Sequence, residues 1–264
     1  MGTETEILEK VKTMFRSVIS YQLSVAAALN LGLAGLALSG CINPPNSPCD
    51  SGSSSSSSSS TSGGSSAPTV DLTKVDVPPG VVPTGTLISD GSNPVVQNID
   101  PPGGWFMMND HSVKGSMDPA TNGDFPAAMS SGMVHTSGKL YTDWGGGIGL
   151  NFVGDQMLKP VDASKFKGIR FKASGSTPMH VGLATVVTMP EFGVCTKCYD
   201  HYAVDINDLS ATPKTYEYTW DKLHQSGWGA PKAKLDPKTI IGLNFTSKGP
   251  AAWDFSIDDL EWIK

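Results

Sequence analysis

Few charged side chains and few signatures of catalysis or nucleotide binding occur in this 264-residue chain. Only 17% of the residues are charged, and the formal net charge is −6. This balance excludes a general nucleic-acid binder held by counterion release, and it argues against a polybasic membrane-surface segment. The sequence contains no Walker-type loop, dinucleotide fingerprint, zinc-protease helix motif or G-x-S-x-G turn. It therefore carries no sign of the common nucleotide- or zinc-dependent enzymes.

Convincing helical periodicity is also missing, and from about Leu87 onward apolar residues recur at every second position instead. Such alternation predicts half-buried strands, and Gly, Asp and Pro turn signals separate the alternating stretches. The clearest sets are Ile148/Leu150/Phe152, Ile169/Phe171, Val181/Leu183, Tyr202/Val204/Ile206, Tyr216/Tyr218/Trp220, Ile241/Leu243/Phe245 and Trp253/Phe255/Ile257. Seven or more strands of this kind predict an all-β fold, a jelly-roll β-sandwich, over residues 85–264.

The last predicted strand changes phase near its middle. Trp253, Phe255 and Ile257 share one face, whereas Leu260 and Trp262 fall on the other face unless one residue is inserted. A β-bulge at Asp258–Asp259 would bring both sets to the core. Trp253 and Trp262, together with Trp220, are then expected to be core residues.

Residues 1–40 have the pattern of an export signal. Lys10, Lys12 and Arg16 precede the apolar stretch 23–40, which ends in Leu-Ser-Gly directly before Cys41. This ending resembles the bacterial lipobox, in which a peptidase cleaves before a lipid-modified cysteine. The resemblance implies that Cys41 is lipidated, and the Ile42 that follows it implies sorting to the outer membrane or cell surface. A single membrane-spanning anchor is the alternative, because the apolar stretch is just long enough to cross a bilayer.

Residues 41–84 are predicted to form a flexible linker. They hold a serine run, Ser53–Ser60, and several prolines and glycines, with almost no large apolar side chains. Such a composition buries too little apolar area to offset the entropy of ordering. The Pro/Gly-rich stretch 78–83 is read either as a further spacer or as the lead into the first strand.

Several loose motifs, taken in their order along the chain, carry a family resemblance. They are Trp144–Phe152 (WGGGIGLNF), Val161–Phe171 (VDASKFKGIRF), Cys198–Tyr202 (CYDHY), Tyr216–Trp220 (YEYTW), Gln225–Gly229 (QSGWG) and Phe255–Leu260 (FSIDDL). This order resembles the galactose-binding-like jelly rolls, and in particular the family 11-type carbohydrate-binding modules. The resemblance covers most of residues 87–264 and implies a non-catalytic, surface-tethered protein that binds a polysaccharide or oligosaccharide.

The resemblance also implies a structural calcium ion held by acids of the first and last strands. The matching positions here are Asp90 and Asp258. Because calcium takes six to eight oxygen ligands, backbone carbonyls would have to supply most of them.

Sugar recognition requires flat apolar surfaces for stacking and fixed polar groups for the hydroxyls. Residues of these types in predicted loops or at strand ends are the candidate ligand contacts. Three of the tryptophans adjoin glycines, where the backbone can turn outward; for each of them core packing is the alternative. The candidates are Trp105, Asn109, Asp110, Tyr141, Trp144, His201 and Trp228.

Cys195 and Cys198 are expected to form a local disulfide, because a C-x-x-C pair in an exported protein favours one. Free thiols are an alternative, and so is a metal site that uses His201 as a third ligand. The state of Cys49, in the predicted linker, is left open.

An enzyme is not expected, although two alternatives to sugar binding remain. A glycosidase needs two facing carboxylates, and the predicted domain has only three glutamates, Glu191, Glu217 and Glu261, none in a recognisable pair. A cryptic glycoside hydrolase is one alternative, and turnover that Glu217→Ala abolishes would support it. An envelope structural or adhesion protein with a protein partner is the other alternative.

Overall fold

A computed structural model describes residues 77–129, 131–154, 158–176, 178–247, 249 and 251–264. All of them belong to one unit of the chain, Ser62–Lys264. The predicted signal peptide, Cys41 and the linker as far as residue 76 lie outside the described residues. Within the part that is described, none of the helices has the length and apolar character needed to cross a membrane.

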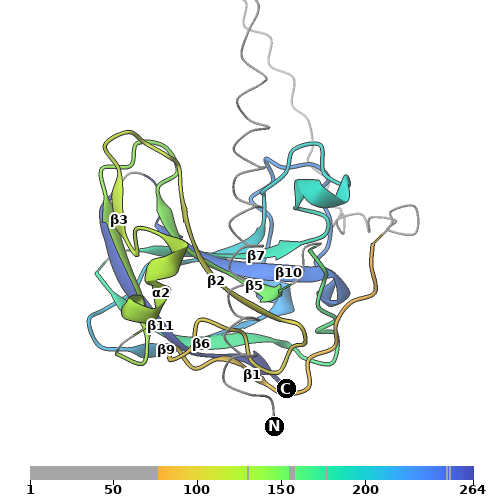
Figure 1. Ribbon diagram of the computed structural model, residues 1–264. Helices are drawn as coiled ribbons and strands as arrows, with labels where there is room; N and C mark the ends of the chain where they lie inside the picture. The colour runs from red at the N-terminus through yellow and green to blue at the C-terminus, as the bar shows by residue number, and fades with distance from the viewer. Residues whose placement is uncertain (1–76, 130, 155–157, 177, 248, 250) are drawn as a thin grey trace, which may run out of the picture. The chain divides into compact units, whose positions relative to one another are not determined.

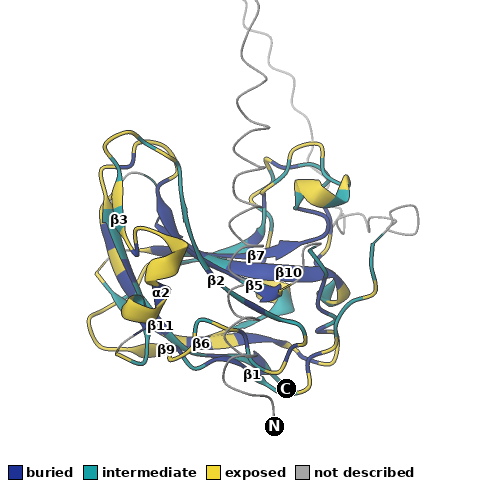
Figure 2. Ribbon diagram, viewed as in Figure 1, coloured by how far each residue is buried: buried dark blue, intermediate teal, exposed yellow. Residues whose placement is uncertain are grey.

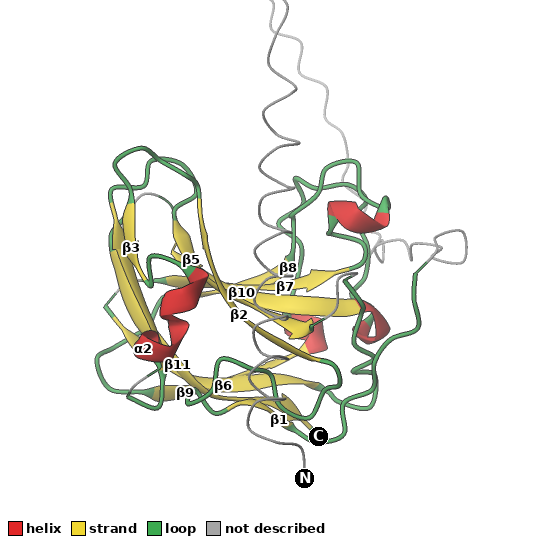
Figure 3. Ribbon diagram, in the orientation of Figure 1, coloured by secondary structure: helices red, strands yellow, loops and turns green. Residues whose placement is uncertain are grey.

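Two antiparallel sheets lie one above the other and confirm the predicted all-β sandwich (Figures 1 and 3). The six-stranded sheet has the order β3-β4-β11-β6-β9, and β1 pairs with β11 as well. Its strands are β1 (Leu87–Ser89), β3 (Ser116–Asp118), β4 (Val134–Lys139), β6 (Gly168–Gly175), β9 (Lys214–Thr219) and β11 (Trp253–Ile263). The five-stranded sheet has the order β2-β5-β10-β7-β8. Its strands are β2 (Pro102–Asn109), β5 (Gly146–Val153), β7 (Met179–Thr185), β8 (Tyr202–Ile206) and β10 (Ile240–Ser247).

Within the described residues, helical segments are short and lie in the connections between strands. They are η2 (Asn122–Asp124), α2 (Phe125–Ala128), η3 (Pro190–Phe192), η4 (Trp220–Lys222) and η5 (Pro237–Thr239). Pro126, Pro190 and Pro237 each stand in the first turn of their helix, where a missing N–H costs nothing. The described chain therefore has no helical layer over either sheet.

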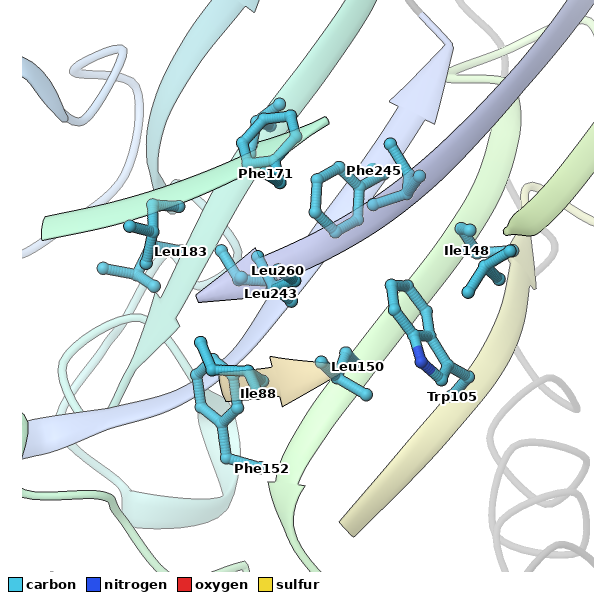
Figure 4. Close-up of a cluster of buried hydrophobic side chains, with 14 of the residues drawn as sticks. Ile88, Trp105, Ile148, Leu150, Phe152, Phe171, Leu183, Leu243, Phe245 and Leu260 are labelled. Carbon is cyan, nitrogen blue, oxygen red and sulfur yellow. The ribbon is translucent and has the colours of Figure 1, made fainter. Parts of the chain in front are cut away.

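The core lies between the sheets and contains the alternating apolar residues that the sequence marked (Figures 2 and 4). Phe171 of the six-stranded sheet meets Phe245 of the five-stranded sheet edge to face, with ring centroids 5.2 Å apart. Trp253 and Trp262 are buried there as predicted. Trp220 lies in η4 and is only half-buried against the core, with its Nε1 donating to the Phe166 carbonyl at 2.7 Å.

The predicted bulge in β11 is present. The pairing of β11 with β6 shifts register between Asp258 and Glu261, and Asp259 has a φ of +46°. Leu260 and Trp262 consequently face the core together with Ile257. A second register shift, between Ile240 and Gly242 in β10, was not predicted. It turns Ile241 away from the main core into a small cluster with Ala184 and Val186, so the expected phase was wrong at Ile241.

The folded domain begins earlier than residue 85. Val81 donates its N–H to Pro160 at 2.8 Å and accepts from the N–H of Asp162 at 2.9 Å. Pro83 is buried as well. The stretch 77–84 is therefore part of the domain and not of the linker, because its backbone groups find partners there.

Candidate functional site

The candidate site is the outer face of the five-stranded sheet, the side turned away from the six-stranded sheet. Side chains alternate across a strand, so the neighbours of the core residues point to this face. One row across the sheet is Phe106, Gly149, Asn244, Gly182 and Ala203, and the next is Met108, Gly147, Thr246, His180 and Asp205. Loops at both ends of the strands extend beyond this face, away from the six-stranded sheet (Figure 1).

Glycines make the centre of the outer face flat and leave room for an aromatic ring. Phe106 lies over Gly149, where a Cβ would collide with the ring atoms. Gly149 in turn sits opposite Asn244, and Gly182 follows on the next strand. Phe106 is half-buried, so part of its ring remains accessible. A flat aromatic surface beside free space is suited to stacking against the apolar face of a sugar.

Two asparagines, Asn151 and Asn244, lie beside Phe106 on the outer face. The side chains of Asn151 and Asn244 are half-buried, and neither makes a hydrogen bond within the described part of the chain. A side-chain amide offers both donors and an acceptor, which is the combination that pairs with hydroxyl groups. The described residues of the two rows, with Asn151, include no lysine or arginine. The outer face is therefore suited to a neutral hydroxylated ligand rather than an anion.

Two histidines lie at the β7–β8 side of the outer face. His180 Nδ1 is 2.7 Å from Asp205 Oδ1. His201 packs near Gly182, and its Nδ1 is 2.8 Å from Thr188 Oγ1. Burial, followed by the nearby His180, lowers the pKa of His201 to about 4, although Asp200 opposes the shift. His201 is thus neutral near pH 7 and available for hydrogen bonding.

At one end of the strands, Asp110 fixes the loop that displays Trp144. Asp110 Oδ2 accepts from the N–H groups of Asp143 and Gly145, at 2.9 and 3.0 Å, and Oδ1 accepts from Ser112 at 3.0 Å. Burial opposes ionisation of Asp110, but these hydrogen bonds prevail and lower its pKa to about 2. We call Asp110 and these three amides the Asp110 clamp. Trp144 stands in the chain between Asp143 and Gly145, whose amides belong to the clamp, and it is 42% exposed.

Asp200 holds a second loop, which displays Trp228, in the same way. Asp200 Oδ2 accepts from the N–H groups of Gly227 and Gly229, at 2.8 and 2.9 Å, and Oδ1 accepts from Ser226 at 2.9 Å. Asp200 is only 2% exposed, whereas Trp228 is 57% exposed. We call Asp200 and these three amides the Asp200 clamp.

Three of the predicted ligand contacts take structural roles instead. Trp105 is 6% exposed and faces the core, where its Nε1 donates to Ser89 Oγ at 3.2 Å. Its preceding glycines lie in a strand and do not turn the chain outward: Gly103 packs closely against the backbone of β5, and Gly104 lies against the Pro94 carbonyl. Tyr141 is 5% exposed and packs against Trp253 at 5.3 Å between ring centroids. Asn109 Oδ1 accepts from the N–H of His111 at 2.9 Å and shapes the turn after β2.

The predicted disulfide is formed, and it lies beside the Trp228 loop. The sulfur atoms of Cys195 and Cys198 are 2.08 Å apart. Between these cysteines, Lys197 accepts from the Ala230 N–H at 3.0 Å, which joins the two loops. The cysteines are therefore not ligands of a metal site with His201.

The two acids expected to hold calcium lie near one another, Asp90 directly after β1 and Asp258 in β11. Asp258 Oδ1 would be 3.2 Å from a Cβ at Gly91, the residue after Asp90. Burial raises the pKa of Asp258, and the charges of Asp259 and Asp90 raise it further, against the effects of the Asp259 N–H and Lys172. In the described ranges no group of three or more His, Cys, Asp or Glu side chains is placed to hold a metal. The pair can contribute carboxylate oxygens to calcium only if backbone carbonyls complete the shell.

Two of the three glutamates approach the same arginine, Arg170. Arg170 Nε donates to Glu261 at 2.7 Å, and its guanidinium is 4.0 Å from Glu217. Both glutamates belong to the six-stranded sheet, and Glu191 lies in η3. A cavity of about 400 Å³ beside α2 is lined by Asp118, Asp124, His135 and small residues, and none of the three glutamates lines it.

Sequence reasoning missed Phe106, Asn244 and Asp200. The first was detectable, because alternation places Phe106 on the face opposite to Trp105 and aligns it with the glycines of β5. Asn244 shared that signal, as the polar residue between Leu243 and Phe245. The sequence holds no comparable signal for Asp200, because its hydrogen-bond partners lie more than twenty residues away along the chain.

No protein-family model and no curated protein matches the chain. Among solved structures, the chain is similar to the family 11 carbohydrate-binding module of the cellulosomal cellulase Lic26A-Cel5E of Clostridium thermocellum. The identity is 17% over 68% of this chain and 94% of that chain, with a TM-score of 0.43. A family 11 module from the same organism, in complex with a β-1,3-1,4-mixed-linked tetrasaccharide, matches with 16% identity over 67% and 94% of the two chains and a TM-score of 0.43.

Proposed function

We propose that the protein is a non-catalytic binder of a neutral polysaccharide or oligosaccharide, which it holds on the outer face of the five-stranded sheet. The observation that carries the proposal is the Phe106 ring over Gly149, beside the amide of Asn244, which has no hydrogen-bond partner among the described residues. An aromatic surface next to fixed polar groups is the arrangement that sugars require.

Affinity electrophoresis of the full-length chain, purified in detergent, tests this function. The panel consists of β-1,3-1,4-mixed-linked glucan, xyloglucan and galactomannan, with polygalacturonate as an acidic polysaccharide. We expect retardation by at least one neutral polymer and none by polygalacturonate, because the described residues of the two rows on the outer face include no lysine or arginine. A folded chain that no panel member retards would refute the proposal and favour a protein partner.

We further propose that Cys41 carries lipid and tethers the domain to the outer membrane or cell surface. The support is the sequence pattern ending at Cys41, with the serine-rich linker behind it. More than one acyl chain makes such anchoring stable. Metabolic labelling with palmitate is expected to mark the wild-type chain and to fail for Cys41→Ser, and equal labelling of both would refute it.

A further inference from the structure

The two exposed tryptophans are held by the same arrangement at opposite ends of the candidate site. In each clamp one carboxylate oxygen accepts from the amides that directly precede and follow the tryptophan, those of Asp143 and Gly145 or of Gly227 and Gly229. Gly145 and Gly227 have φ values of +96° and +95°. The two loops are unrelated in sequence position, so the shared geometry calls for a shared explanation.

Folding stability alone does not account for this arrangement. Asp200 is almost fully buried, and a buried carboxylate is costly unless hydrogen bonds satisfy it. The hydrogen bonds fix the backbone that carries each tryptophan, while the tryptophan itself is about half exposed to solvent. A preorganised aromatic group loses little conformational freedom when a ligand covers it, which is where such rigidity gains affinity.

The register of the sheet places the two tryptophans at opposite strand ends. Trp144 lies two residues before the start of β5 at Gly146, whereas the Trp228 loop is joined to the chain that follows the end of β7. β5 and β7 both pair antiparallel with β10 and so run in the same direction. The eight residues of β5 span roughly 25 Å at about 3.3 Å per residue, and Phe106 lies between the ends.

We propose that Asp110 and Asp200 are positioning residues that hold Trp144 and Trp228 as two rigid end contacts, so that the protein selects an extended glycan chain over a short one. This inference rests on the proposed carbohydrate-binding function. Phe106 and Asn244 bind the middle of the chain, and the tryptophans add contacts that only a ligand long enough to reach them can make.

The experiment compares chain lengths. The full-length chain and its variants are titrated with the neutral panel polysaccharide that retards the wild type most, and with the trisaccharide cut from that polymer. We expect Asp110→Asn and Asp200→Asn each to weaken polysaccharide binding about tenfold, because an amide group cannot accept at both positions. We expect the trisaccharide affinity to stay within twofold of the wild type, since that ligand does not need the ends.

Matched variants separate positioning from general damage. Asp118→Asn in β3 and Glu191→Gln in η3 each remove one negative charge outside the two clamps, and they should bind like the wild type. Trp144→Ala should reproduce Asp110→Asn, and the double variant Asp110→Asn/Trp144→Ala should bind no more weakly than either single variant, because both act through one contact.

Several outcomes would overturn the inference while leaving the proposed function intact. They are equal losses for the polymer and the trisaccharide, full additivity in the double variant, or wild-type polymer affinity in Trp144→Ala and Trp228→Ala. A wild-type chain that no neutral polymer retards would instead refute the proposed function itself.

Discussion

Replacing Phe106 by alanine should weaken glycan binding about tenfold while leaving the fold in place. The ring rests with one face over Gly149, so roughly a third of the 150–250 Å² typical of an aromatic side chain, about 60 Å², remains for a ligand to cover. At about 25 cal/mol per Å² this area corresponds to ~1.5 kcal/mol, or close to a factor of ten in Kd. The residue faces away from the core, so no cavity forms there.

Isothermal titration with the panel polymer that retards the wild type measures the loss, and near-ultraviolet circular dichroism verifies that the core tryptophans keep their packing. Val82→Ala is the matched control, because Val82 is also exposed and apolar but lies outside the outer face. The reasoning is refuted if Phe106→Ala binds like Val82→Ala. A second variant, Gly149→Ala, keeps the aromatic ring but displaces it, and it should lose a similar amount of affinity.

Two further predictions concern calcium and pH. If Asp90 and Asp258 hold calcium, the ion should raise the melting temperature of the wild type, and EDTA should reverse the rise. The variant Asp258→Asn should melt at one temperature with or without calcium. Identical melting of the wild type in both conditions would exclude the site. His201 has its pKa lowered from 6.5 to about 4, so the unfolded chain binds more protons than the folded chain between these values. Stability should therefore be complete above about pH 6.5 and fall toward pH 4 by up to about 1.4 kcal/mol per pH unit. Urea unfolding should show a shallower fall for His201→Gln, and an unchanged slope would contradict the assignment.

The sandwich and its core could be predicted because they depend on local alternation. The bulge at Asp258–Asp259 followed from the same logic, since only an inserted residue lets Trp253 and Trp262 share the core. The early part of the domain, around Val81, could not be recognised from composition. Its order comes from backbone hydrogen bonds to Pro160 and Asp162, which lie far along the chain.

The ligand contacts were harder to predict because a glycine beside a tryptophan has two meanings. Beside Trp144 and Trp228 it permits a positive φ and an exposed loop. Before Trp105 it permits close packing of strands, and the indole is buried. Alternation would have resolved the difference, since it assigns Trp105 to one face and its neighbour Phe106 to the other.

The state of the carboxylates around the outer face is the strongest argument for binding rather than hydrolysis. Asp205 is engaged with His180, while Asp110 and Asp200 each accept from three backbone amides. A general acid must hold a proton near neutral pH, yet the pKa of Asp110 is lowered to about 2 by the hydrogen bonds that hold its loop. These carboxylates maintain the shape of the site, and their engagement supports the proposed binding function.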